Sequence, residues 1–576
     1  MKFGVLALDY DGTIACEGIL SPEVKAAIAE ARSRGIVVII VTGRTLADLK
    51  QVAGNLEFLD SVVAENGAVL SFPNGQTRLL GHCPPPAFLD ALCRRGIQFQ
   101  AGECVIEADA GMAPQILAVI RELELPLVLL FNRSRLMVLP QAISKSTGFQ
   151  EALNVLRLSA HNAIGIGDAE NDHDLLSACE IGVAVSWGSP ALQRRADEVI
   201  HGDGPTAVAG YIRQASQQMR LHEGSTSRHR ISVGTGRDGK PVAFPIDGRN
   251  VLIVGDPHAG KSWGAGLACE QMILQGYCVC VVDPEGDYGS LESLPGVVVL
   301  GGADHPPDLP DVARALRHFD LSTVIDLSRI GYVEKLSYLK ELLPMLASLR
   351  RTTGLPHRIV VDEAHYFLSE PNVMQLLDFE LGAYTIVTYR PSDLHPDLRR
   401  GLHVVISKQL TQANEVQTLL NMAGNKNLEG EWTKILGALE PEEAALLPGE
   451  TGGPLERFKL LPRMTPHVRH RSKYFDVEVT SGHEFVFTEN GAIVGTPARS
   501  LKQFVSLLGS ESHGCLAGHV RRGDFSRWIA GTFHDNPLAS DVRKIEQRYR
   551  LGHLDDVRRP LSQAIQERYC FSSEQT

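Results

Sequence analysis

LALDYDGT, at residues 6–13, is a short apolar run that ends in two carboxylates, Asp9 and Asp11. Similar apolar runs at residues 37–41, 61–63 and 163–166 alternate with amphipathic segments up to about residue 213. This alternation is typical of a parallel α/β sheet, in which ligands bind at the carboxyl ends of the strands. The sequence therefore predicts a site at that edge of the sheet, and the two carboxylates belong to it.

The spacing of the two carboxylates suits phosphoryl chemistry. An aspartate at a strand tip can attack phosphorus and form an aspartyl-phosphate. A carboxylate two residues later can protonate the leaving oxygen and then deprotonate the water that resolves the intermediate. Asp9 and Asp11 have this spacing, and Gly12 allows the backbone to curl around a phosphate. An Asp-x-Asp-Gly run is also ordinary turn chemistry, so the pair needs further support.

Three later segments supply that support. VTGR at residues 41–44 ends a strand with a hydroxyl, a glycine and a cation, and Lys145 can neutralise a phosphate. GDAEND at residues 167–172 ends another strand in carboxylates, which suit Mg²⁺. Together with residues 6–13, these segments resemble the four motifs of the haloacid dehalogenase superfamily, and the resemblance covers about residues 1–213.

The resemblance implies a Rossmann-like α/β core with Mg²⁺-dependent phosphatase activity. The implied catalytic residues are the nucleophile Asp9, the general acid/base Asp11, the phosphate ligand Thr42 and the stabilising cation Lys145. The implied Mg²⁺ ligands are Asp9, Asp11 through its backbone carbonyl, and Asp168, with Asp172 supporting the metal and the lysine. The candidate substrate contacts are Arg44, Asn66 and Asn171.

The interval between Thr42 and Lys145 leaves room for an inserted α/β cap at about residues 81–140. With ENGA at residues 65–68 before it, the chain resembles the Cof-type subgroup, which acts on small phosphorylated metabolites such as sugar phosphates or phosphoglycolate. Relatives that dehalogenate lack the acid at Asp11, so phosphate-ester hydrolysis is favoured. One departure is Ser146, where many Cof-type members have glycine.

A second phosphate motif lies further along the chain. GDPHAGKS at residues 255–262 follows an apolar strand and opens a helix, which is the context of a Walker A loop. Its backbone N–H groups, with Gly255 and Gly260 in the loop, can cradle phosphates. Lys261 can reach the β and γ groups, and Ser262 can hold Mg²⁺. The motif predicts an ATP site.

RIVVDEAH at residues 358–365 supplies the other half of such a site. Asp362 at a strand end can support Mg²⁺ through water, and Glu363 can polarise the attacking water. The Asp-Glu-Ala-His run is also found in superfamily-2 helicases, which need downstream motifs that are not found in this chain. DPEGDY at residues 283–288 and TYRPSDL at residues 388–394 follow strands on either side of Asp362.

These motifs together resemble HerA/FtsK-type ATPases, which form hexameric rings that translocate DNA, and the resemblance implies a RecA-like P-loop domain. Tyr389 stands where that family commonly has a glutamine that senses the γ-phosphate. Arg390, Arg399 and Arg400 are candidates for an arginine finger, or else solvated surface cations. ATP binding is therefore better supported than DNA translocation.

The bulk properties agree with a multidomain protein. A chain of 576 residues is too long for one hydrophobic core. The net charge of −12 argues against coating nucleic acid by bulk charge, but leaves room for a local basic groove. Ten cysteines show no paired framework, and no apolar stretch is long enough to span a membrane. We expect a reduced, cytoplasmic protein without a membrane partner.

We expect five regions: a phosphatase core (1–80 and 141–213), a cap (81–140), a polar linker (214–230), a P-loop ATPase (231–465) and a small α+β domain of unknown role (466–576). The last region opens with a basic, His-rich stretch at residues 466–471 and contains a hairpin near residues 484–494. Its arginines near residue 521 could bind nucleic acid. The spacing of Phe525, Trp528 and Ile529 instead favours an apolar helical face with solvated arginines.

The combined prediction is a Mg²⁺-dependent phosphatase that hydrolyses a phosphate monoester through an aspartyl-phosphate and is fused to an ATP-hydrolysing domain. The alternatives are a DNA-translocating ring whose phosphatase processes nucleic-acid phosphates, and an ATP-driven switch in a larger complex. The expected partners are a small phosphorylated substrate and ATP, with a homo-hexamer and DNA as further possibilities. The acidic pI and Tyr389 favour the metabolite phosphatase over the DNA translocase.

Overall fold

The computed structural model describes residues 1–569 except 133, 222–227, 247, 258, 303, 369–375, 425–428, 448–454, 467–478, 480–481, 490 and 534–535. The chain divides into two compact units. The first comprises Met1–Pro284 and Leu291–Pro466, and the second comprises Glu285–Ser290 and His467–Thr576. Among the described helices, none combines the length and the apolar character needed to cross a bilayer.

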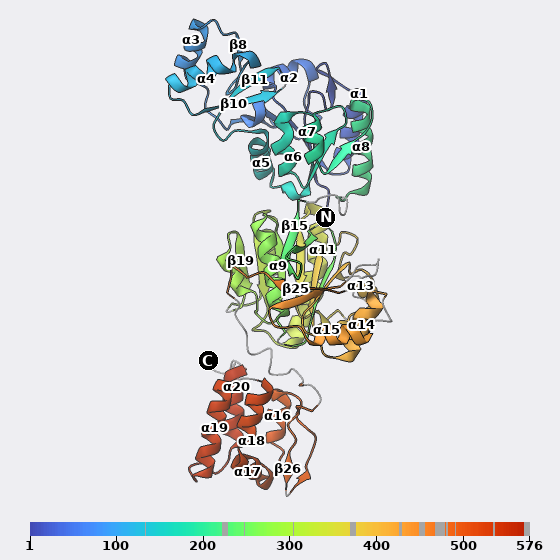
Figure 1. Ribbon diagram of the computed structural model, residues 1–576, viewed down its shortest axis with the longest axis vertical. Helices are drawn as coiled ribbons and strands as arrows, with labels where there is room; N and C mark the ends of the chain where they lie inside the picture. Colours follow the sequence, from blue (N-terminus) through green and yellow to red (C-terminus); the bar gives the residue numbers. More distant parts are fainter. Residues whose placement is uncertain are drawn as a thin grey trace. The chain divides into compact units, whose positions relative to one another are not determined.

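The first unit begins with an eight-stranded sheet (Figure 1). Its strands, in spatial order, are β14 (Glu198–Ile200), β13 (Ile181–Val185), β12 (Ala163–Gly167), β1 (Val5–Leu8), β4 (Val37–Val41), β5 (Ser61–Ala64), β6 (Val69–Ser71) and β7 (Thr77–Leu79). The strands from β14 to β5 are parallel, whereas β6 pairs antiparallel with both β5 and β7. The expectation of a parallel sheet is therefore wrong at this edge, because short turns join β5, β6 and β7 directly.

Helices cover the faces of this sheet. Val5 and Ala7 of β1 pack in one core with Phe149 and Leu153 of helix α5. Helices α1 and α8 lie side by side (Figure 1). The helices of this part of the chain are α1 (Pro22–Ser33), α2 (Leu46–Ala53), α5 (Lys145–Leu156), α6 (His173–Ala178), α7 (Pro190–Arg195) and α8 (Pro205–Gln218). A short hairpin, β2 (Ala15–Cys16) with β3 (Ile19–Leu20), follows β1.

A separate antiparallel sheet is inserted between β7 and α5. Its strands, in spatial order, are β10 (Leu127–Asn132), β11 (Arg135–Pro140), β9 (Ile106–Asp109) and β8 (Phe99–Ala101), and its helices are α3 (Pro86–Arg94) and α4 (Ala113–Glu122). Phe88, Ile116 and Leu136 belong to a hydrophobic core of its own. All of these elements lie inside the range predicted for the cap.

The linker predicted for residues 214–230 is wrong at its start. Helix α8 continues to Gln218, and Ala215 and Ser216 are buried on the same helix face as Val208 and Ile212. The small side chains continue the buried stripe at helical spacing, although the segment reads as polar. Residues 222–227 of the predicted linker lie outside the described residues, and strand β15 begins at Arg230.

The rest of the first unit is built on an eleven-stranded sheet. Its parallel strands, in spatial order, are β23 (Val404–Ser407), β17 (Val251–Val254), β22 (Tyr384–Thr388), β21 (Arg358–Val361), β18 (Val279–Asp283), β20 (Ser322–Asp326) and β19 (Val297–Gly301). Beyond β23 lie the antiparallel strands β24 (Glu443–Leu446), β25 (Glu456–Leu460), β15 (Arg230–Gly236) and β16 (Pro241–Pro245). Strands β17, β18, β21 and β22 lead into the four motifs identified in the sequence at residues 255–262, 283–288, 358–365 and 388–394.

Helices surround the parallel strands. They are α9 (Lys261–Leu274), α10 (Leu309–Ala315), α11 (Tyr332–Thr353), α13 (Pro396–Arg400), α14 (Ala413–Met422) and α15 (Glu429–Gly437). Strand β22 lies between β17 and β21, so the ends of all three strands meet at one edge of the sheet. This edge carries the predicted ATP motifs.

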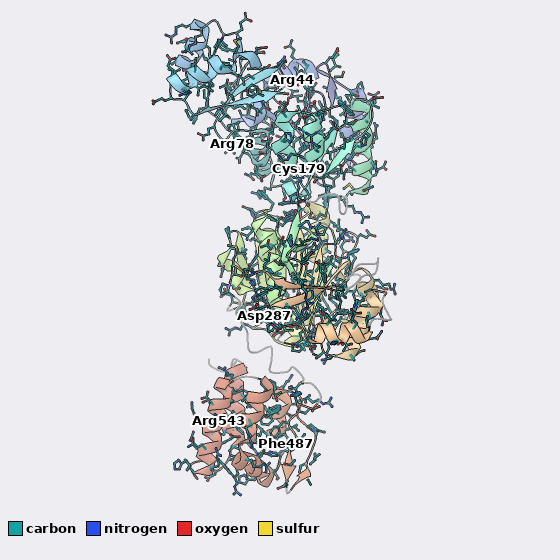
Figure 2. The ribbon with its side chains drawn as sticks, viewed as in Figure 1. Arg44, Arg78, Cys179, Asp287, Phe487 and Arg543 are labelled. Atoms are coloured by element: carbon teal, nitrogen blue, oxygen red, sulfur yellow. The ribbon has the colours of Figure 1, made fainter. Side chains whose placement is uncertain are left out.

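The second unit contains a helical body and a two-stranded hairpin. Its elements are β26 (Thr488–Glu489), β27 (Ala492–Ile493), α16 (Leu501–Leu508), α17 (His513–Arg522), α18 (Asp524–Trp528), α19 (Asn536–Arg550) and α20 (Arg558–Tyr569). Phe487, labelled in Figure 2, is buried in its core with Phe525 and Ile529, against which Trp528 packs. The predicted apolar helical face is confirmed by the burial of Phe525 and Ile529. The arginines at 521, 522 and 527 are exposed, as expected. The predicted basic stretch lies outside the described residues from 467 onward.

Candidate active sites

The first candidate site lies at the carboxyl ends of β1 and β12, which are adjacent parallel strands. Asp9 directly follows β1, and its backbone N–H donates to the carbonyl oxygen of Ile166 at 2.9 Å. Asp168 directly follows β12, and Asp172 lies four residues further on. The three carboxylates are buried, and one oxygen of each lies within 4.8 Å of the others. The sheet therefore brings together the acids that the motifs predicted.

Lys145, the first residue of α5, is the cation of this cluster. Its Nζ donates to Asp9 and, at 2.5 Å, to Oδ1 of Asp172. Burial lowers the pKa of Lys145, but the carboxylates of Asp172 and Asp9 outweigh it and raise that pKa above the usual value. Oδ2 of Asp172 accepts from the backbone N–H groups of Asp168 and Ala169. Asp172 thus fixes both the lysine and the turn that carries Asp168.

The charge of the cluster fits a divalent cation. Burial raises the pKa of Asp9 well above its usual range, and the Asp172 carboxylate raises it further, while Lys145 opposes them. Three buried carboxylates face a single lysine, so the cluster carries an excess of negative charge. Carboxylate oxygens are the ligands that Mg²⁺ prefers, and a divalent cation would balance this excess.

The backbone around Gly12 is shaped by this cluster. Gly12 has a φ of +81°, and a Cβ placed on it would lie 2.5 Å from Oδ2 of Asp168. No other residue type fits there without displacing the carboxylate. The indole N–H of Trp187 donates to the carbonyl oxygen of Gly12 at 2.7 Å. Thr42, which directly follows β4, is buried at the same edge of the sheet.

Asp11 is in a different environment from Asp9. Its side chain is 46% exposed, and both of its oxygens accept from the guanidinium of Arg44, from Nε at 2.6 Å and from a terminal nitrogen at 2.7 Å. Arg44, labelled in Figure 2, also donates to Asp48 at 2.6 Å. These hydrogen bonds raise the pKa of Arg44 although burial opposes the shift. Arg44, a predicted substrate contact, therefore binds the predicted general acid.

A cavity of about 390 Å³ opens above the carboxylates. Asp9, Asp11, Thr42, Arg44, Asp168 and Asn171 line it from the eight-stranded core. Gln100, Glu107, Asn132, Ser134, Arg135 and Met137 line it from the inserted sheet. Asn66 is not among the lining residues, but its side chain accepts from Asn171 at 3.1 Å. The lining residues of the inserted sheet were not identified from the sequence, and they follow no motif that could have revealed them.

The second candidate site lies at the carboxyl end of β17. Gly260 has a φ of +91° and directly precedes α9, where Lys261 and Ser262 are buried. The Ser262 hydroxyl donates to Oδ2 of Asp362 at 3.3 Å, although 100 residues separate them in the sequence. Lys261 Nζ donates to the carbonyl oxygen of Asp256 at 3.1 Å. The lysine, the hydroxyl and the aspartate predicted for one ATP site are therefore neighbours.

Glu363 and Tyr389 border this group. Glu363 is 1% exposed and has a φ of +46°, and one of its carboxylate oxygens lies 3.5 Å from Nδ1 of His365. Burial lowers the pKa of His365 to about 4. The Tyr389 ring lies 4.3 Å from the His365 ring, and Lys261 Nζ lies 5.6 Å from the Tyr389 ring centre. Tyr389 thus stands beside the predicted phosphate-binding lysine.

The three candidate finger arginines lie at different depths. Arg390 packs over the Tyr389 ring at 5.1 Å and lies 3.8 Å from Asp393. Arg399 and Arg400 lie on the short helix α13. Arg400 is 77% exposed and pairs with Asp397 at 2.9 Å. Only Arg390 has a described contact with a residue bordering this site.

One residue of this site was missed in the sequence. Lys408 directly follows β23 and is buried, and a Cβ placed on Gly255 would lie 2.7 Å from the Lys408 Cβ. Lys408 Nζ donates to the carbonyl oxygen of Pro441 at 2.7 Å. Burial lowers the pKa of Lys408 to about 8. A lone lysine after a strand gives no motif, so only the sheet order places it beside the loop.

Comparisons with known proteins concern the first site. The family model of the haloacid dehalogenase-like hydrolases matches residues 6–83 and 101–212. A phosphoglycolate phosphatase of Methanosarcina acetivorans is 24% identical over 224 residues, covering 37% of this chain and 97% of the relative. One from Methanothermobacter thermautotrophicus is 27% identical over 211 residues, covering 34% of this chain and 94% of the relative.

Another relative is named for a different activity. The 5-amino-6-(5-phospho-D-ribitylamino)uracil phosphatase YcsE of Bacillus subtilis is 22% identical over 234 residues, covering 36% of this chain and 94% of the relative. Among solved structures, a haloacid dehalogenase-like hydrolase from B. subtilis matches with a TM-score of 0.32 and 18% identity, covering 37% of this chain and 99% of that chain.

Proposed function

We propose that the part of this chain matched by the haloacid dehalogenase-like hydrolase model, residues 6–83 and 101–212, hydrolyses a small phosphate monoester at Asp9. The observation that supports this most is the buried cluster at the end of β1. Lys145 contacts both Asp9 and Asp172, with Asp168 beside them and a cavity above. A nucleophile, a cation and surplus carboxylates at the floor of one cavity are what phosphoryl transfer to an aspartate requires.

The proposed reaction has two displacements. The Asp9 carboxylate attacks phosphorus while the bond to the leaving oxygen breaks, and Asp11 protonates that oxygen. Asp11 then takes a proton from the water that attacks the aspartyl-phosphate, which releases phosphate and restores Asp9. Lys145 and Thr42 stabilise the charge on the phosphoryl oxygens. Asp9, Asp168 and the Asp11 carbonyl would hold Mg²⁺, which when bound supplies further positive charge to those oxygens.

We propose a small, anionic metabolite as the substrate. The cavity volume of about 390 Å³ suits a compact molecule, and its lining is rich in charged and amide side chains. Phosphoglycolate and sugar phosphates fit this description. The names of the relatives, two phosphoglycolate phosphatases and a phosphoribitylamino-uracil phosphatase, support the same class.

A panel of phosphate esters tests the first site. We expect Mg²⁺-dependent release of phosphate that is abolished in Asp9→Asn, because an amide cannot attack phosphorus. Asp11→Asn should accumulate phosphorylated protein, detectable by mass spectrometry, since the intermediate forms but water is not activated. Full activity in Asp9→Asn would exclude this nucleophile, and an unchanged rate in excess EDTA would exclude the metal.

We propose that the second site binds and hydrolyses ATP. The contact between the Ser262 hydroxyl and Asp362 supports this most, because both groups are needed around a nucleotide-bound Mg²⁺. Lys261 would neutralise the β and γ phosphates, and Glu363 would polarise the attacking water. The backbone N–H groups at the start of α9 would cradle the phosphates.

ATP hydrolysis by two variants tests the second site. Glu363→Gln should bind ATP and hydrolyse it at least about 100-fold more slowly, because the cradle remains while the carboxylate is lost. Lys261→Ala should lose ATP binding, and Asp9→Asn, the matched control in the other site, should keep the full ATPase rate. Loss of ATPase activity in Asp9→Asn with retention in Lys261→Ala would overturn the assignment of two sites.

Measuring both activities, with and without ATP and duplex DNA, distinguishes the alternative roles of the ATPase. We propose that it regulates or assembles a metabolite phosphatase, which the net charge of −12 favours over DNA translocation. Phosphatase activity that changes with ATP, and ATPase activity that is indifferent to duplex DNA, is the expected result. Strong stimulation of the ATPase by DNA would instead support a translocating ring. ATP binding without appreciable turnover would support a switch.

A further inference from the structure

A cluster of two histidines and a glutamate lies at the opposite edge of the first sheet from Asp9. His161 precedes β12, Glu180 directly precedes β13, and His229 directly precedes β15. Nδ1 of His161 lies 2.8 Å from Oε2 of Glu180. Nε2 of His229 lies 3.8 Å from the same oxygen, and the three donor atoms are all within 4.8 Å of one another. This edge takes no part in either proposed reaction.

The hydrogen bonds of His161 determine which ring nitrogen is available. Its Nε2 lies 3.0 Å from the carbonyl oxygen of Gln275. A carbonyl oxygen only accepts, so Nε2 carries the proton. In neutral His161 the lone pair is therefore on Nδ1, which faces a carboxylate oxygen. Two lone pairs at 2.8 Å repel each other, so a positive centre must join them, either a second proton on His161 or a metal ion.

His229 supplies the observation that favours a metal ion. Its Nε2 is buried and has no hydrogen-bond partner among the described residues. A single additional proton on His161 would leave this nitrogen unsatisfied, which carries a free-energy cost. An imidazole nitrogen binds a metal ion through its lone pair, which is free in the neutral form of the ring. A metal ion would use both nitrogens and the carboxylate at once.

The surroundings hold these groups in place. Tyr277 donates its hydroxyl proton to Oε2 of Glu180 at 2.7 Å, and its ring stacks on His161 with the ring centres 3.7 Å apart. Arg228, next to His229, donates to the carbonyl of Ser177 at 2.9 Å and pairs with Asp197. Outer hydrogen bonds of this kind, to a carbonyl or a hydroxyl, orient ligands in protein metal sites.

We propose that His161 Nδ1, Glu180 Oε2 and His229 Nε2 bind one divalent transition-metal ion of the zinc type, with a fourth position open to water. Tetrahedral zinc with bonds of 2.0–2.1 Å places its ligand atoms about 3.3 Å apart. The observed 2.8 Å and 3.8 Å separations from Glu180 Oε2 bracket that value, and the two histidine nitrogens lie within 4.8 Å of each other. Two nitrogens and one oxygen are a ligand set that zinc accepts and Mg²⁺ disfavours.

The ion would join two parts of the chain that are distant in the sequence. Two of its ligands belong to the hydrolase domain, and the third lies at the entrance to the eleven-stranded sheet, which begins at Arg230. Gln275 and Tyr277, which hold the ligands, come from the segment between α9 and β18. Binding should therefore stabilise the folded chain by mass action without altering the chemistry at Asp9.

The full-length protein, stripped of metal with a chelator, is titrated with Zn²⁺ in millimolar Mg²⁺, which occupies the carboxylate sites. We expect one more Zn²⁺ bound per wild-type chain than per His229→Gln chain, and a Zn²⁺-dependent rise in Tm that this variant lacks. With Co²⁺, the wild type should show the intense visible absorption of a four-coordinate ion. His305→Gln, at an exposed position, is the matched control and should behave as the wild type.

Phosphatase activity at saturating Mg²⁺ should be unchanged in His229→Gln, which also shows that the variant is folded. Should that variant fail to fold, His161→Gln serves for the same titration. Equal Zn²⁺ stoichiometry in the wild type and the folded variant would overturn the proposal. So would a wild-type Tm that does not respond to Zn²⁺, and in either case the cluster is an imidazolium–carboxylate pair.

Discussion

At the scale of single residues, Arg44 distinguishes the two carboxylates that we propose to be catalytic, because it binds only one of them. Asp9 is buried and held by Lys145, whereas Asp11 is half-exposed and held by two N–H groups of one planar guanidinium. A bidentate pair fixes the orientation of the carboxylate as well as its position. We therefore regard Arg44 as a positioning residue for Asp11, in place of the substrate contact expected from the sequence.

Replacing Arg44 with methionine tests this role. Arg44→Met keeps an unbranched side chain but removes the guanidinium and its two N–H donors. Asp11 is then free to rotate away from the leaving oxygen. We expect kcat to fall by about 10- to 100-fold with a small change in KM. Arg78→Met is the matched control, because Arg78 is exposed and pairs with Glu151 away from the cavity. A large rise in KM with unchanged kcat would restore the role of substrate contact.

At the scale of elements, one side chain joins the eight-stranded core to the inserted sheet. The Glu65 carboxylate is fully buried and accepts from the backbone N–H groups of Glu103 at 2.8 Å, Cys104 at 2.8 Å and Val105 at 3.1 Å. These amides form the turn before β9. Glu65 itself has a φ of +52°, so the backbone is strained locally to place this carboxylate. The contact fixes the inserted sheet, which lines one side of the cavity, relative to the carboxylates of the eight-stranded core that line the other side.

Glu65→Gln tests that contact. Glutamine has the same size, but its NH₂ group would face backbone N–H donors, leaving at least one of them unsatisfied. We expect a loss of about 1–3 kcal/mol in stability, measured by denaturant unfolding, and a higher KM for the phosphate ester. Glu103→Gln, whose side chain is exposed on the same turn, should change neither quantity. An unaltered KM in Glu65→Gln would mean that the turn does not shape the cavity.

At the scale of the whole molecule, the second site bears on whether copies of this chain form an oligomer. We propose that a cation from a neighbouring subunit completes this site, as the resemblance of its motifs to ring-forming ATPases implies. Arg400 is exposed on α13, and its described ion pair is with Asp397 of the same helix, so it is available to a neighbouring chain. We propose a homo-oligomer, a hexamer by resemblance to such rings.

A dilution series tests the assembly. Specific ATPase activity should rise with protein concentration in parallel with the mass measured by light scattering, because the site is complete only between subunits. Arg400→Ala should lower the ATPase rate of the assembled protein. Arg314→Ala, at a similarly exposed arginine with an aspartate partner on its own helix, should not. A monomer with concentration-independent turnover would contradict the ring and favour a self-contained switch.

The sequence by itself determined the features that depend on neighbouring residues. An apolar run that ends in Asp9 or at Gly255 is a buried strand followed by a turn, because burial and turn preferences act over a few residues. Parallel strands then bring their carboxyl ends to one edge, so the grouping of Asp9 with Asp168, and of Ser262 with Asp362, follows from strand order. Resemblance to a known family added Lys145, whose position no local pattern reveals.

Only the tertiary structure decided the features that join distant segments without a motif. The polar segment at 214–218 is helical because Ala215 and Ser216 are covered by the packed domain, which composition does not record. The cavity wall, the Glu65 contact and the cluster of His161, Glu180 and His229 unite residues far apart in the sequence. Their free energy comes from burial and hydrogen bonding that exist only after the sheets have assembled. The segments that carry them therefore appear, in the sequence alone, as ordinary loops and strand ends.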